Sequence, residues 1–141
     1  MNRIINGIIF DTDKSGLIAT IDNGLPIEDL SYFSESLYKT DDGKFFLHCK
    51  GQSKSHYHIL DWDGKNSIGS EEIHPIEQVA TAFWMLMHGI KNFYAVEKKY
   101  IETATVFSEA LKKNFPDADF NKCAFKDLIF YIKILNIQKY N

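Results

Sequence analysis

The sequence predicts an α+β fold, with an antiparallel sheet in the N-terminal part and helices after it. Between residues 3 and 62, short runs of β-branched and aromatic residues alternate with Gly, Asn and Asp turn signals, a pattern typical of hairpins. From Pro75 onward, apolar residues recur every three or four positions, which is the period of an amphipathic helix. Strands first and helices second is the order that indicates α+β.

The chain has 141 residues, which is the usual size of one domain. We therefore predict a single α+β domain over residues 1–141, with a β-rich half over 1–74 and a helical half over 75–141. The apolar content of 45% and the charged content of 25% are ordinary for a globular protein. A chain of this length buries roughly two thirds of the surface that it exposes when unfolded.

The first hairpin is predicted at "RIINGIIF", residues 3–10, because Asn6-Gly7 favours a two-residue turn with positive φ at both positions. Three further strand regions follow, interrupted by the "NGLP" breaker and by a Gly/Asn/Ser loop that reaches to about Ser70. They are a strand over 16–21, a second hairpin over 35–49 and a strand over 55–62.

Three helices are predicted in the second half. The first begins at Pro75, a favourable first helical residue, and ends at Gly89. Its apolar stripe is Ile76, Val79, Ala80, Phe83, Leu86 and Met87. Trp84 and Met85 lie off this stripe, so the helix is apolar over much of its girth, which favours burial over a partner-binding stripe.

The second helix is predicted from about Asn92 to Lys113, and a "FPDAD" segment ends it. Asp117 or Asp119 is expected to cap a third helix, which extends to Leu135. A strand over "DLIFYIKIL", residues 127–135, is the alternative for that last segment.

Charge and cysteine usage exclude several classes of protein. Residues 1–74 carry seven Lys/Arg against twelve Asp/Glu, and residues 75–141 carry nine against seven. Because a nucleic-acid binder needs a clustered basic face, we expect no sequence-specific contact with nucleic acid. Cys49 and Cys123 are expected to be free thiols in a reducing compartment. With no signal sequence and no membrane-length apolar run, we expect a cytoplasmic protein without a membrane segment.

The stretch "DTDKSGLIATID", residues 11–22, resembles an EF-hand calcium loop. Asp11, Asp13 and Ser15 stand at its first, third and fifth positions, and Asp22 stands at the twelfth. An EF-hand needs a helix on each side, whereas a hairpin pattern precedes this stretch and "NGLP" follows it. A second, weaker match over 61–72 has Lys65 where a ligand oxygen belongs. We therefore predict turn and strand structure, with no calcium site.

The histidines offer a different kind of candidate site. His56 and His58 would point to one face of a strand, and either His48 or Cys49 from a neighbouring hairpin could complete a metal site. Surface histidines on a half-exposed sheet are the alternative. No catalytic constellation and no phosphate-binding glycine loop is present, so the sequence predicts no enzyme activity, no metal and no cofactor.

Three stretches between residues 4 and 88 form a recognisable set: "FDTDKSGLIATIDNG", "EDLSYFSESLYKTDDGKFFLHCKG" and "GKNSIGSEEIHPIEQVATAFW". Through these stretches, residues 4–88 resemble a family of small uncharacterised proteins from Gram-positive chromosomes, plasmids and phages. The stretches match the family's start, its Asn-Gly turn, its Glu-x-Leu-Tyr and Phe-Leu strands, and its Ile-x-Pro entry into a short helix. The family's Gly-x-Gly-Gly segment is reduced here to Gly51, and residues 89–141 form an unmatched extension.

The resemblance implies a non-enzymatic protein that binds a protein partner, such as an inhibitor of a bacterial defence nuclease complex of the anti-CRISPR kind. The acidic half and its aromatics supply the expected contacts: Asp61, Asp63, Trp62, Tyr32 and Tyr38. Reversing both aspartates to Lys is expected to weaken binding and to leave the fold intact. The alternatives are a small metal-dependent enzyme or ligand-binding module that uses His48, His56 and His58, and a toxin-immunity protein.

Overall fold

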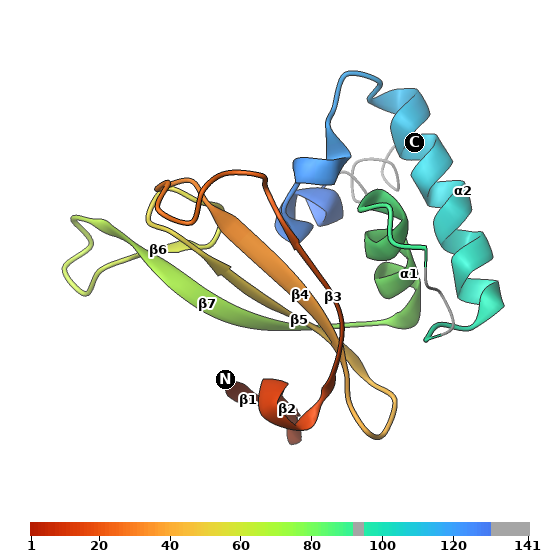
Figure 1. Ribbon diagram of the computed structural model, residues 1–141, viewed down its shortest axis with the longest axis horizontal. Helices are drawn as coiled ribbons and strands as arrows, with labels where there is room; N and C mark the ends of the chain where they lie inside the picture. The colour runs from red at the N-terminus through yellow and green to blue at the C-terminus, as the bar shows by residue number, and fades with distance from the viewer. Residues whose placement is uncertain (92–94, 131–141) are drawn as a thin grey trace. The chain divides into compact units, whose positions relative to one another are not determined.

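The computed structural model describes residues 1–91 and 95–130 of the chain (Figure 1). Its contacts divide the chain into two compact units, Met1–Ile76 and Glu77–Asn141. The first unit holds all the strands of the described residues, and the second holds the α-helices. The predicted α+β class is confirmed, and the β-rich part ends at Ile76. That the two units unfold as a single domain stays a prediction.

A small two-stranded sheet opens the first unit. Strand β1 (Asn2–Ile5) pairs with β2 (Ile8–Asp11), with Ile5 opposite Ile8. Asn6 and Gly7 between them have φ values of 51° and 78°, as a two-residue turn of this kind requires. The first predicted hairpin is therefore confirmed. It could be predicted because two adjacent residues determine its turn.

The main sheet has five antiparallel strands in the order β3-β4-β5-β7-β6. Strands β4 and β5 form the second predicted hairpin, and β3 covers the predicted strand over 16–21. The bounds are β3 Gly16–Asp22, β4 Phe33–Lys39, β5 Phe45–Gly51, β6 His58–Leu60 and β7 Ser67–Ile76. Residues 55–57, predicted as strand, form turns instead, so only a short edge strand remains there.

Strand β7 corrects the prediction of a loop to about Ser70 followed by a helix at Pro75. It is the longest strand of the described residues, and Pro75 lies opposite Phe46 of β5. The C-terminal half of β7 has β5 as its only partner among the described strands, because β6 pairs with residues 67–69. Proline cannot donate a ladder hydrogen bond, and a strand with one free edge tolerates it.

Both faces of the main sheet carry buried side chains of the first unit. On one face, Phe46 and Ile73 pack with Phe10 from the small sheet, and Phe10 meets Phe46 edge-on with ring centroids 5.5 Å apart. The other face buries a cross-strand group made of Phe33, Leu37, Leu47 and Cys49. With burial on two sides, most residues of β4 and β5 are buried or half-buried, although β4 contains Ser34, Glu35 and Ser36.

In the second unit, α1 (Gln78–Met87) buries Phe83, Trp84 and Met85. The prediction that Trp84 and Met85 serve burial is confirmed. The predicted stop is confirmed too, because Gly89 has a φ of 68° and donates its N–H to Leu86. With Ile90 donating to Met85 at 2.9 Å, this is the Schellman arrangement that ends many helices.

Helix α2 (Lys98–Asn114) begins later than the predicted start at Asn92, and residues 92–94 lie outside the described residues. Its buried residues are Ala104, Ser108 and Leu111. A 3-10 turn follows at Phe120–Lys122, and Asp119 makes no side-chain cap there. Residues 125–130 are helical, so the alternative strand is wrong for residues 127–130, while 131–135 lie outside the described residues.

Candidate functional site

The first unit carries a projecting hairpin, which we call the hairpin arm and define as residues 58–69. Strand β5 ends at Gly51, opposite Ser70, so the part of β7 before Ser70 pairs with β6 alone. Ile59 lies opposite Ile68, and Leu60 lies opposite Ser67. Figure 1 shows the arm extending past the ends of β4 and β5. A surface of this shape presents side chains on both faces and at its tip.

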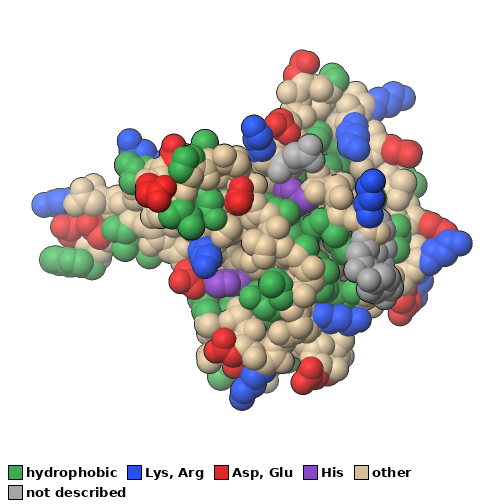
Figure 2. All heavy atoms as spheres, in the orientation of Figure 1, with side chains coloured by type: hydrophobic (Ala, Val, Ile, Leu, Met, Phe, Trp, Pro, Cys, Tyr) green, Lys and Arg blue, Asp and Glu red, His purple; other side chains and the backbone are tan. Residues whose placement is uncertain are grey.

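The arm exposes large apolar side chains. Trp62 at the tip is 97% exposed and Leu60 is 59% exposed, while the opposed pair Ile59 and Ile68 is 47% and 44% exposed. Figure 2 shows hydrophobic side chains beside acidic and basic ones at this end of the molecule. Single exposed apolar residues are common, but a group of four on one projecting element is typical of an interaction site.

The two predicted aspartates of the arm build its tip. Asp61 accepts hydrogen bonds from the Lys65 N–H at 3.2 Å and from the Asn66 N–H at 3.3 Å, and Asp63 accepts from the Lys65 N–H at 3.0 Å. Reversing both aspartates would therefore remove these loop hydrogen bonds as well as reverse the charge. That the rest of the fold stays intact remains a prediction.

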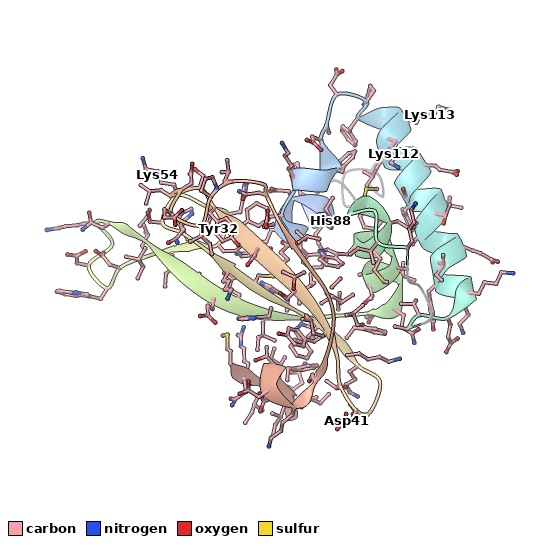
Figure 3. The ribbon with its side chains drawn as sticks, viewed as in Figure 1. Tyr32, Asp41, Lys54, His88, Lys112 and Lys113 are labelled. Carbon is pink, nitrogen blue, oxygen red and sulfur yellow. The ribbon has the colours of Figure 1, made fainter. Side chains whose placement is uncertain are left out.

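The two predicted tyrosines lie elsewhere in the first unit. Tyr38 is half-buried and stacks on Phe46 with ring centroids 5.2 Å apart, so it contributes to the core cluster. Tyr32 lines an open cleft of about 820 Å³, together with Ile27, Lys50 and Gln52. Figure 3 shows Tyr32 beside the sheet, away from the tip of the arm. Of the five predicted contact residues, the structure thus brings together Asp61, Trp62 and Asp63.

A second exposed apolar group lies between β3 and β4. Leu25, Ile27 and Leu30 are all exposed. Their segment is fastened to the chain before the arm, since Gln52 Nε2 donates to the Ile27 carbonyl at 2.9 Å and the Lys54 N–H donates to the Leu30 carbonyl at 2.8 Å. Sequence reasoning treated "NGLP" as a breaker and missed this group. The signal was available in "LPIEDL", which places three aliphatic residues in a turn that has no partner to bury them.

The three candidate histidines lie in different settings. His56 is in a turn against the Phe33 ring, and His58 begins β6 with Nδ1 2.6 Å from the Ser55 carbonyl oxygen. The prediction that His56 and His58 share one face of a strand is therefore wrong. His48 Nε2 lies 2.8 Å from Glu71 Oε2, and this contact lowers the pKa of the Glu71 carboxyl. Within residues 1–91 and 95–130, no three His, Cys, Asp or Glu side chains are grouped as metal ligands would be.

The calcium-like stretch has the turn and strand structure that we predicted. Asp11 ends β2 and Asp22 ends β3, a strand of seven residues that spans about 20 Å. Each carboxylate closes a local turn, because Asp11 accepts from the Asp13 N–H at 2.9 Å and Asp22 accepts from the Gly24 N–H at 2.7 Å. The first and twelfth positions therefore cannot converge on one ion.

A buried polar group lies at the base of the arm. The Tyr57 hydroxyl donates to Glu35 Oε2, and both side chains have no exposed surface. Cys49, also without exposed surface, stands opposite Glu35 in the β4–β5 register. No substrate can reach side chains that are wholly buried, so this group is suited to holding the segment before β6 on the sheet.

At alkaline pH, the free energy of unfolding should depend on the ionisation of Tyr57. Burial, followed by the nearby Glu35 carboxyl, raises the pKa of Tyr57 far above its ordinary value of 10.0. Above about pH 10, unfolded Tyr57 loses its proton while folded Tyr57 keeps it. The contribution of Tyr57 to the free energy of unfolding is therefore complete below about pH 10 and declines above it. We expect wild type to lose about 1.4 kcal/mol per pH unit more than Tyr57→Phe above pH 10 in urea unfolding. Parallel pH profiles would contradict this.

None of the helices among residues 1–91 and 95–130 has the length and apolar character that a bilayer crossing needs. Comparison with models of protein families, with curated proteins and with solved structures found no match to the chain.

Proposed function

We propose that this chain is a non-enzymatic protein-binding factor and that the hairpin arm makes the contact. The observation that carries the proposal is Trp62, which is 97% exposed at the tip of a projecting element beside exposed Leu60. Tryptophan is among the residues that contribute most binding energy at protein interfaces. The backbone under it is held by the Asp61 bonds, so the indole is presented on an ordered loop.

The partner that fits this surface has an apolar pocket with a basic rim. The arm combines apolar side chains with the carboxylates of Asp61 and Asp63, and the first 74 residues carry five more acidic than basic side chains. Complementary charge speeds the encounter of two proteins and disfavours wrong partners. Together with the family resemblance, this makes a bacterial defence nuclease complex the first partner class to test, because its nucleic-acid channel is basic.

A toxin-immunity protein would use the same kind of surface, and the identity of the captured protein separates the two roles. A metal-dependent or ligand-binding role for His48, His56 and His58 remains the alternative from another class. Its separate test is the metal content and the activity of the double variant His56→Ala/His58→Ala.

The experiment is affinity capture from host cells followed by kinetics with the identified, purified partner. We expect the association rate to fall as salt rises, because exposed charges are screened over about 10 Å at 0.1 M ionic strength. His56→Ala/His58→Ala should reduce affinity much less than Trp62→Ala, because His56 and His58 lie at the base of the arm and not at its tip. The proposal is wrong if His56→Ala/His58→Ala abolishes the activity of a folded protein while substitutions of Asp61, Trp62 or Asp63 leave that activity unchanged.

A further inference from the structure

The hairpin arm needs support from its base. Beyond Gly51 it consists of β6 and the start of β7 only, and β6 has three residues. An isolated two-stranded hairpin is at best marginally stable in water. A contact surface on such an element is ordered only where the strands are fastened to the rest of the sheet.

The segment before β6 supplies that fastening through hydrogen bonds of its backbone and of the Ser55 hydroxyl. The Gln52 N–H donates to the Tyr32 carbonyl at 2.9 Å, and the Ser55 hydroxyl donates to the Gln52 carbonyl at 2.8 Å. The Ser55 hydroxyl also accepts from the Tyr57 N–H at 3.2 Å. These bonds fold residues 52–57 into a turn that delivers the chain to His58, the first residue of the arm.

Tyr57 joins this turn to both strands beneath it. Its hydroxyl donates to Glu35 of β4, and its carbonyl accepts from the Ser70 hydroxyl of β7. Its ring packs edge-on against Phe33, with centroids 5.7 Å apart. One side chain and one carbonyl thus connect the start of the arm to β4 and to β7, at the level where β5 ends.

Two glycines allow the strands to approach at this level. A Cβ on Gly69 would lie 2.6 Å from the Gly51 carbonyl oxygen, and a Cβ on Gly51 would lie 2.9 Å from the Ser55 Cβ. Real Cβ atoms essentially never approach so closely, so the end of β5, the turn before β6 and β7 are packed closely at this level.

We propose that Tyr57, through its bond to Glu35, is a positioning residue that sets the direction of the hairpin arm and holds Trp62 ready for binding. This inference rests on the proposed function for its purpose, although its test needs no partner. Preordering the arm reduces the entropy lost on binding, so Tyr57 contributes to affinity without touching the partner.

The experiment measures the mobility of the arm in the full chain. Wild type and Tyr57→Phe are compared by hydrogen exchange of the amides over 58–69. Trp62 fluorescence anisotropy is measured in a Trp84→Phe background, which leaves Trp62 as the one tryptophan of the chain. We expect Tyr57→Phe to speed exchange in the arm roughly fivefold to tenfold, as the loss of one buried hydrogen bond would, and to lower the anisotropy. Hydrogen exchange is measured without the Trp84 substitution. The exchange test therefore stands even if the Trp84→Phe background folds poorly.

Two matched variants separate positioning from general loss of stability. Ile73→Val truncates the core on the other face of the sheet, and it should weaken the fold without a selective effect on residues 58–69. Glu35→Gln keeps an acceptor oxygen for the Tyr57 hydroxyl and should keep the arm protected. The proposal is overturned if Tyr57→Phe leaves arm exchange at the wild-type rate, or if Ile73→Val accelerates it equally. An ordered arm with no binding partner would instead contradict only the proposed function.

Discussion

Replacing Trp62 by Ala is expected to weaken partner binding by about 30-fold or more, which corresponds to roughly 2 kcal/mol. The same change should leave the free energy of unfolding within about 0.5 kcal/mol, because the side chain is 97% exposed and no core contact is lost. This combination of a large effect on binding and a small effect on stability distinguishes a contact residue from a structural one.

The affinity for the captured partner is measured by calorimetry or surface plasmon resonance. Urea unfolding of wild type and of Trp62→Ala checks that the fold is unchanged. Val106→Ala is the matched control, because Val106 is an exposed apolar residue on α2 and lies outside the first unit. Equal affinities for wild type and Trp62→Ala would exclude the arm as the contact. Comparable losses in the two variants would show that exposed apolar residues contribute without specificity.

Phe83→Ala in α1 is expected to destabilise the protein by about 3–5 kcal/mol, the usual cost of removing a large buried aromatic side chain. Phe83 is 2% exposed, so the substitution leaves a cavity as well as losing apolar contact. Chemical unfolding followed by circular dichroism measures the change. A loss below about 1 kcal/mol would mean that Phe83 is not part of a well-packed core.

The same variant tests the prediction of one cooperative domain. Phe46→Ala removes a buried aromatic from the first unit, as Phe83→Ala does from the second. If the whole chain unfolds cooperatively, each variant moves one shared transition to lower denaturant. Two transitions, each sensitive to one of the variants, would show that Met1–Ile76 and Glu77–Asn141 unfold independently.

Features encoded by a few adjacent residues were predictable from the sequence. Asn6-Gly7 specifies its hairpin because both residues tolerate positive φ, and Gly89 ends α1 for the same reason. The α1 pattern was readable because a helix buries side chains that lie three and four positions apart. The rejection of EF-hand geometry at residues 11–22 also followed from local signals, since the hairpin and the breaker leave no room for flanking helices.

The sequence by itself therefore determined the α+β class and the two predicted hairpins, both through short-range patterns. Only the tertiary structure decided that residues 67–76 form a strand, because β7 is stabilised by pairing with β5, whose paired residues lie 19 to 31 positions earlier in the chain. It also decided that Tyr57 meets Glu35 and that Tyr38 stacks on Phe46. Such partners are selected by the register of distant strands, and no local propensity encodes a register between segments that far apart.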